Sequence, residues 1–369
     1  MYSIYEWSIV YITIYAFVCS FIPNKKTSKK VFIFLASLHL FIIQGLRSEF
    51  VGGDVQTYKN HFNNQSFIGV FDVIEGAFEP AYHYLTLFLS KMGISFQFFM
   101  IMISLFTFIV LGIALYKFSP HPYISFLLYL FFGIYDFGFS GLRQTIAMSI
   151  VLISFYFILE KKPKKYYFTI LIATLFHSTA LIFIVFYVLI NNKLINKLYW
   201  YFYPVLLVII LGFGSRITYF ATVLFNEKLL RSYSSSFTSG FGMDELVLIA
   251  LFIIGALLYF LMSQLNDNKN YKSLLLLTSV AMLVQLLSPY SYFFIRFNLY
   301  FYHFVILFAP LVYDIVLNLV SKKEKLLNIF IKAVFALIFF IVIFRFYNGY
   351  LEQNPHLILP HSFYWEYKI

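Results

Sequence analysis

The chain has 369 residues, of which 61% are hydrophobic and 12% are charged. With a mean hydropathy of +0.82, it has too few polar residues to cover its own surface in water, which excludes a water-soluble protein. The net charge of +11 is compatible with nucleic-acid binding. The lysines, however, lie in short clusters between apolar runs, a pattern that orients membrane proteins, so no nucleic-acid partner is expected.

Apolar runs long enough to cross a hydrocarbon core of about 30 Å recur along the chain and predict an all-α polytopic membrane protein. The single cysteine, Cys19, lies in the first run, which excludes a disulfide framework and a thiolate metal cluster. We find no cleavable signal peptide and treat residues 1–369 as one transmembrane domain. About ten transmembrane helices are predicted, at residues 3–22, 31–46, 95–117, 123–139, 142–159, 199–214, 244–264, 273–290, 296–319 and 327–347.

Three lysine clusters determine the predicted orientation. They follow the first, fifth and ninth predicted spans: Lys25, Lys26, Lys29 and Lys30; Lys161, Lys162, Lys164 and Lys165; Lys322, Lys323 and Lys325. Cytoplasmic loops carry an excess of lysine and arginine, so we place all three clusters in the cytoplasm. The N-terminus and the long loop 47–94 then lie outside, as does a second loop at 215–243.

Two apolar segments do not fit this pattern as ordinary spans. Residues 82–92 would form a helix of roughly 16 Å, too short to cross the membrane, and we expect a short outer helix there. Residues 166–190 lie between two lysine-containing segments that both favour the cytoplasm. A single crossing would place the lysines at 269, 272 and 322–325 outside, so we prefer a re-entrant hairpin with its tip near His177 and Ser178. Irregular backbone at that depth requires a cavity lined by protein or water.

Charged residues collect on the predicted outer face. The loop carries acids and a Gly-Gly-Asp turn ending at Asp54, where glycine permits backbone angles that other residues avoid. Arg143 and Arg296 each open a span from the same side, while Arg216 and Arg231 lie in the second outer loop and are expected to be surface charges. The sequence therefore predicts a polar outer vestibule, with the acids Glu49, Asp54, Asp72, Glu75 and Glu79 in the first loop.

Four motifs in order resemble the EpsG family of bacterial polysaccharide polymerases, which is related in role to the Wzy polymerases. They are GLRSEFVGGDVQTY (45–58), EPAYHYL (79–85), FSGLRQTIAM (139–148) and ATLFHSTALIF (173–183). The resemblance is clear over residues 40–190 and generic beyond 200, apart from an arginine on a late span. The positions that carry it are Arg47, Asp54, Tyr58, Glu79, Tyr82, Arg143, Gln144, His177, Ala180 and Arg296.

The resemblance implies a glycosyltransferase that joins oligosaccharide repeat units carried on undecaprenyl diphosphate, at the outer face of the bacterial cytoplasmic membrane. The product would be O-antigen (on lipopolysaccharide), capsule or exopolysaccharide, and a flippase and a chain-length regulator are possible partners. The architecture would be similar to the type C glycosyltransferases. No cofactor or metal is expected. The predicted catalytic residues are Asp54, Glu79, Arg143 and His177, and the predicted substrate-binding residues are Arg47, Tyr58, Tyr82, Gln144, Ser178 and Arg296.

The residue types suit this chemistry. Loss of the lipid diphosphate leaves negative charge on phosphate oxygens, which arginine binds through two parallel hydrogen bonds. Activation of the acceptor hydroxyl requires a carboxylate or imidazole within hydrogen-bond reach. We favour a positioning role for His177, with the acceptor proton passing to Asp54 or Glu79.

Structural roles remain open for each of these residues. Arg143 at a helix end can extend to the lipid headgroups. His177 can be a buried histidine bonded to a carbonyl, Asp54 can cap a turn, and Glu79 can favour a helix start. We expect structural roles for His39, His121 and His303.

Other functions also remain open. A flippase or transporter would favour sites near the bilayer midplane and an internal repeat, and we find no repeat. Another enzyme acting on lipid-linked sugars, such as a type C mannosyltransferase or an O-antigen ligase, is a second alternative, although a ligase would carry a larger late outer loop. An acyltransferase fits less well, because His177 has no neighbouring aspartate.

Overall fold

The computed structural model describes residues 3–65, 78–225, 243–320, 344, 347, 351 and 356–366. Within these residues the secondary structure is helical, apart from one isolated bridge between Arg47 and Phe363. The helices are α1 (Ile4–Ser20), α2 (Lys25–Gly45), α3 (Val55–Asn64), α4 (Pro80–Lys91), α5 (Phe96–Phe118), α6 (Pro122–Phe131), α7 (Ile134–Ser140), α8 (Leu142–Leu159), α9 (Pro163–Phe176), η2 (Ser178–Val185), α10 (Phe186–Asn191), α11 (Lys193–Phe225), α13 (Met243–Leu261), η3 (Ser263–Asn266), α14 (Lys269–Gln285), η4 (Ser288–Tyr290) and α15 (Tyr292–Val320).

The protein is a multi-pass membrane protein. In the described part of the chain, 6 helices are long and apolar enough to cross a membrane, or up to 7 if the bent pair α6 and α7 forms one span. The predicted spans 3–22 and 244–264 appear as shorter apolar helices, and the predicted span 327–347 lies almost entirely outside the described residues. The predicted number of about ten spans is therefore not confirmed.

Two predicted spans differ in shape from the expected single helix. The segment 123–139 is divided into α6 and α7, which meet at an angle of 53°. Gly133 lies between them with φ of 64°, a left-handed conformation that glycine adopts without steric cost. The segment 199–214 is part of the 33-residue helix α11, so that residues 215–225 of the predicted outer loop are helical.

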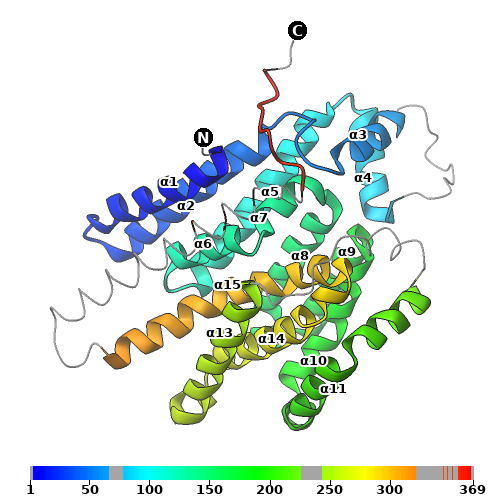
Figure 1. Ribbon diagram of the computed structural model, residues 1–369. Coiled ribbons are helices and arrows are strands. Elements are labelled where there is room, and N and C mark those ends of the chain that lie inside the picture. The colour runs from blue at the N-terminus through cyan, green and yellow to red at the C-terminus, as the bar shows by residue number, and fades with distance from the viewer. Residues whose placement is uncertain are drawn as a thin grey trace.

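Several helices that are neighbours in the sequence pack against each other, among them α8 with α9 and α14 with α15 (Figure 1). Helices α1, α2 and α5 form one side, α8 and α9 pack against each other, and α15 runs against α6, α8 and α14. Buried aromatic side chains such as Phe126, Phe131 and Tyr300 fill the space between them. Large apolar side chains, among them Phe34 and Ile113, are exposed on the outer surfaces of the bundle, as expected where lipid is the solvent.

Lysines from the first two clusters, Lys29 and Lys161, lie at one end of the bundle together with Lys117 and Lys269. The Lys29 ammonium donates to the carbonyl of Ser119 (2.6 Å), which joins α2 to the end of α5. The Lys117 ammonium lies 3.3 Å from the centroid of the Tyr156 ring. The Lys269 ammonium donates to the carbonyl of Leu159 (2.8 Å) at the end of α8. Arg143 begins the same helix, so the arginine and the lysines lie at opposite ends of a span of about 27 Å.

The chain reverses its direction at His177. Helix α9 ends there, and the residue is extended with φ of −156° and ψ of 118° before η2 begins. The Tyr166 hydroxyl donates to the carbonyl of Phe183, and the rings of Tyr166 and Tyr187 lie 5.3 Å apart. The segment after His177 therefore returns to the start of α9. Helix α9 has 14 residues and is about 21 Å long. That this hairpin enters and leaves the membrane on one side stays a prediction.

Candidate active site

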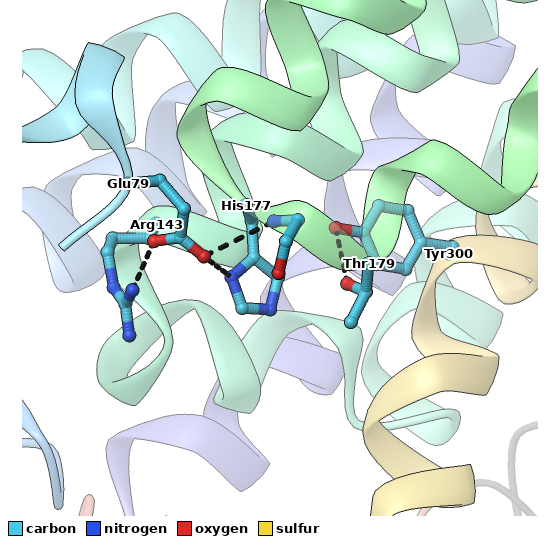
Figure 2. Close-up of polar contacts among 6 residues, drawn as sticks. Glu79, Arg143, His177, Thr179 and Tyr300 are labelled. Atoms are coloured by element: carbon cyan, nitrogen blue, oxygen red, sulfur yellow. Dashed lines mark hydrogen bonds and ion pairs between the residues drawn. The ribbon is translucent and has the colours of Figure 1, made fainter. Parts of the chain in front are cut away.

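The carboxylate of Glu79 connects three parts of the chain at the end of the bundle opposite the lysines. Glu79 precedes Pro80 at the start of α4, Arg143 lies in the first turn of α8, and His177 is the tip of the hairpin. One carboxylate oxygen forms an ion pair with Arg143. The other accepts hydrogen bonds from His177 Nδ1 (3.0 Å) and from the main-chain N–H of Ser178 (3.2 Å) (Figure 2).

The environment of Glu79 keeps it ionised. The side chains of Glu79, Arg143 and His177 are 16%, 21% and 20% exposed, so the cluster is largely shielded but open to solvent at one side. Burial by itself would raise the pKa of the Glu79 carboxyl. The hydrogen bond from His177 and the charge of Arg143 outweigh burial and lower that pKa to about 2.

The hydrogen bond to Glu79 determines which nitrogen of a neutral His177 carries the proton. An ionised carboxylate only accepts hydrogen bonds, so the proton of a neutral imidazole must be on Nδ1, the nitrogen that faces Glu79. The second nitrogen, Nε2, then keeps its lone pair and can accept a proton. A carboxylate that orients an imidazole in this way is a recurring arrangement in enzymes that activate hydroxyl groups.

Aromatic rings surround the guanidinium of Arg143. Its carbon lies 4.1 Å from the centroid of the Phe78 ring and 5.8 Å from that of Tyr58. The Tyr82 ring packs against Tyr58 at 5.6 Å and is fully buried. Stacking and the ion pair with Glu79 fix the orientation of the planar guanidinium, and a fixed orientation favours bidentate binding of a phosphate group.

A second pair of opposite charges lies next to the first. Arg296 in α15 places Nη2 3.6 Å from a carboxylate oxygen of Asp54, and the Gln144 side chain donates to the main-chain carbonyl of Arg296 (2.6 Å). Asp54 is the more open acid, with 43% of its side chain exposed. Tyr58 adjoins both pairs: burial raises the pKa of its hydroxyl, and the charges of Arg143 and Arg296 counteract this.

The structure brings most of the predicted site residues together. Around Glu79, Arg143 and His177 it gathers Tyr58, Ser178, Gln144, Arg296 and Asp54. Glu79 lies at the N-cap of α4, where a carboxylate favours the helix dipole, so the helix-start alternative remains compatible with its position. Asp54 makes no side-chain capping bond to α3, so the capping alternative has no support in its position. Arg143 is paired inside the protein and does not extend away from it, which likewise disfavours a headgroup anchor.

Two predicted substrate-binding residues, Arg47 and Tyr82, are fully enclosed by the protein. Arg47 is completely buried, and its guanidinium donates to the main-chain carbonyls of Val51 (3.2 Å), Phe139 (3.0 Å) and Gln44. Three carbonyls satisfy the group inside the protein, so a substrate contact by Arg47 has no support in its position. Tyr82 is also fully buried among aromatic rings and acts as the packing support of Tyr58.

The other polar residues singled out in the sequence make contacts outside the cluster around Glu79 or lie outside the described residues. Arg216 is exposed on α11, with its guanidinium 5.7 Å from the ring of Phe213. His39, His121 and His303 contact Ser8, Asp314 and the carbonyl of Leu299, respectively, away from the cluster. The acids Asp72 and Glu75, the arginine Arg231 and the lysines at 322–325 lie outside the described residues. Among the described residues, no group of three or more His, Cys, Asp or Glu side chains could hold a metal ion.

Sequence reasoning missed several polar residues that the fold uses. The Thr179 hydroxyl donates to the hydroxyl of Tyr300 in α15 (3.2 Å), which fastens the hairpin tip beside Glu79 (Figure 2). Deeper in the bundle, a buried network centres on Gln285, which contacts Glu245, Ser288, Asn298 and Tyr302. Polar residues inside apolar runs were the available signal for this network, because such residues are costly in a membrane unless paired.

Comparison with known proteins identifies the family of the chain. The chain matches the EpsG family over residues 30–363, nearly its whole length. The protein belongs to the EpsG family. EpsG proteins are Wzy-like polysaccharide polymerases of bacteria, so this chain is a membrane protein of that class. The match extends far beyond residues 40–190, where the motifs are clearest, and includes Arg296. No curated protein and no solved structure matches the chain.

Proposed function

We propose that the protein polymerises oligosaccharide repeat units that are linked to undecaprenyl diphosphate, at the outer face of the cytoplasmic membrane. The observation that carries this proposal is the bridging of Arg143 and His177 by Glu79, which combines a phosphate-binding group with a proton-accepting group. Family membership supports the polymerase class. The separation of this cluster from the lysine-rich end supports the outer location, because lysine clusters favour the cytoplasm.

The reaction transfers the growing glycan from one lipid diphosphate to a hydroxyl of the next repeat unit. The acceptor oxygen forms a bond to the anomeric carbon, and the bond from that carbon to the diphosphate oxygen breaks. The leaving diphosphate takes the bonding electrons, and Arg143 stabilises the charge that develops on it. We assign to Arg296, which lies near Asp54 and Tyr58, the contact with a second anionic group, because the reaction involves two lipid diphosphates.

The geometry changes our assignment of the proton acceptor. Glu79 has a pKa of about 2 and already accepts three contacts, so it is a poor base near neutral pH. Its role is to orient His177 and Arg143. We assign the acceptor proton to His177 Nε2, which has the free lone pair, and a substrate contact to the exposed carboxylate of Asp54.

A reconstituted assay tests this function directly. Purified protein in liposomes receives polyprenyl-diphosphate-linked repeat units, and the assay measures glycan length and released polyprenyl diphosphate. The proposal expects longer glycans with one diphosphate released per added unit, and loss of both products in His177→Ala. A strain that lacks the protein should accumulate single lipid-linked repeat units on the outer face. If those units instead remain on the cytoplasmic face, the protein is a flippase and the polymerase proposal is wrong.

A further inference from the structure

The C-terminal residues 356–366 lie against the loop that leads into α3, at the end of the bundle that contains the polar cluster. In Figure 1 this red segment passes beside the blue loop before α3. Main-chain hydrogen bonds connect the two segments along their length: Ser48 N to Ser362 O (2.7 Å), Gly52 N to Leu357 O (3.0 Å), Gly53 N to His356 O (2.9 Å) and Tyr364 N to Leu46 O (3.0 Å). We call residues 356–366 the C-terminal strap.

Ser140, at the end of α7, connects the strap to the Gly-Gly-Asp turn. Its hydroxyl donates to the carbonyl of His356 (2.8 Å) and accepts the N–H of Gly53 (2.9 Å). The side chain is buried, with 2% of the residue exposed, so water does not readily replace these partners. Ser140 therefore joins the strap, the turn and α7 at one point.

The turn fits tightly against α7. Gly52 has φ of 117°, and a Cβ at this position would lie 2.3 Å from the carbonyl oxygen of Phe139. The buried guanidinium of Arg47 holds the inner side of the turn in place, because it donates hydrogen bonds to the main-chain carbonyls of Val51 and Phe139. The strap closes the outer side, because it accepts the N–H groups of both glycines, Gly52 and Gly53.

Asp54 follows this turn directly and depends on it for its position. Its side chain forms no capping bond to α3, and its contact with Arg296 is loose at 3.6 Å. The strap is itself fastened to α1, where the Tyr5 hydroxyl contacts His361 Nδ1 (2.6 Å) and the carbonyl of Ile358 (3.2 Å). A loose turn would move the carboxylate of Asp54 away from Arg296.

We propose that the C-terminal strap is a working part of the active site, and that Ser140 is a positioning residue that couples the strap to Asp54. This inference rests on the proposed function in its assumption that Asp54 contacts substrate. Support of this kind holds a group that contacts substrate, here the carboxylate of Asp54, to within a fraction of an ångström of its working position. The strap is distant from Ser140 in the sequence, so the site is complete only when these separate segments have folded together.

The first test measures the turn itself and does not depend on activity. In a Cys19→Ser background, Val55→Cys introduces a thiol at a fully buried position beside the turn. The probe is a maleimide added to detergent-purified protein. We expect labelling to become about tenfold faster in Ser140→Ala and in a chain that ends at residue 355. Ser140→Thr, which keeps the hydroxyl, and Ser149→Ala, which removes a buried hydroxyl bonded within α8, should label at the original rate.

The second test connects the strap to Asp54 through a double-mutant cycle. Ser140→Ala should slow polymerisation by about five- to tenfold. If it acts through Asp54, it should add little to Asp54→Asn but multiply the effect of Glu79→Gln. An unchanged labelling rate in both Ser140→Ala and the shortened chain would refute the proposal that the strap holds the turn before Asp54. Faster labelling together with undiminished polymerisation would refute the proposal that the strap contributes to the active site. Absence of polymerisation by the unaltered protein would instead refute the proposed function and leave the labelling result standing.

Discussion

Replacement of Glu79 by glutamine keeps the size of the side chain and removes its charge. The pKa of the carboxyl falls from its ordinary 4.5 to about 2, and this shift measures how strongly the surroundings favour the charged form. A shift of that size corresponds to about 3 kcal/mol, as an upper limit. Glu79 and Arg143 are partly exposed, so solvent screening reduces the interaction, and we take about 2 kcal/mol as the working value.

That interaction orients both Arg143 and His177, so its loss should raise the barrier to glycan transfer. A change of about 2 kcal/mol corresponds to roughly a 30-fold slower reaction. The assay is polymerisation in membranes that carry equal amounts of each variant, as judged by immunoblot. Glu160→Gln is the matched control, because it removes an exposed carboxylate paired with Lys162 at the lysine-rich end (3.4 Å). Polymerisation by Glu79→Gln within threefold of the unaltered protein would refute the reasoning.

The same pKa gives a prediction about pH. The folded-state pKa of Glu79 is lowered, so the stabilisation from its ion pair is complete above about pH 5 and is lost only as the pH falls toward 2. Titration of Glu79 therefore contributes nothing to the pH dependence of activity between pH 5 and 8. The measurement is polymerisation as a function of pH, and an ionisation between pH 5 and 8 that disappears in Glu79→Gln would contradict this prediction.

Three further outcomes are expected. Arg143→Lys keeps the charge but loses the planar guanidinium that Phe78 and Glu79 hold, so polymer should fall more than tenfold at unchanged membrane abundance; normal polymer would mean that Arg143 does not bind diphosphate. His177→Gln and His177→Ala should both abolish polymer if Nε2 is the base, whereas substantial activity in His177→Gln alone would show that the residue only positions substrate. An impermeant thiol reagent should fail to label Leu194→Cys in intact cells, and strong labelling there would contradict the re-entrant hairpin.

Local properties of the sequence were enough to predict a membrane protein and the positions of many of its helices. Whether a stretch of about 20 residues prefers lipid or water depends on that stretch alone, so composition predicted the apolar helices and the lysine clusters. The motifs, which are also local, identified the family and contain Glu79, Arg143 and His177, whose side chains the structure brings into contact. The break at Gly133 was not predicted, because the apolar run continues through it and the left-handed glycine is evident only in the folded backbone.

Tertiary structure decided how these residues are used. Glu79 meets Arg143 and His177 across separations of 64 and 98 residues, and only the packing of α4, α8 and α9 determines which nitrogen of the imidazole faces the carboxylate. Arg47 shows the opposite case: its motif resembles a substrate contact, but the fold encloses it among main-chain carbonyls. The bond from Ser140 to His356 spans 216 residues. Contacts of this kind depend on side chains from distant segments meeting in one low-dielectric space, and no local pattern in the sequence specifies them.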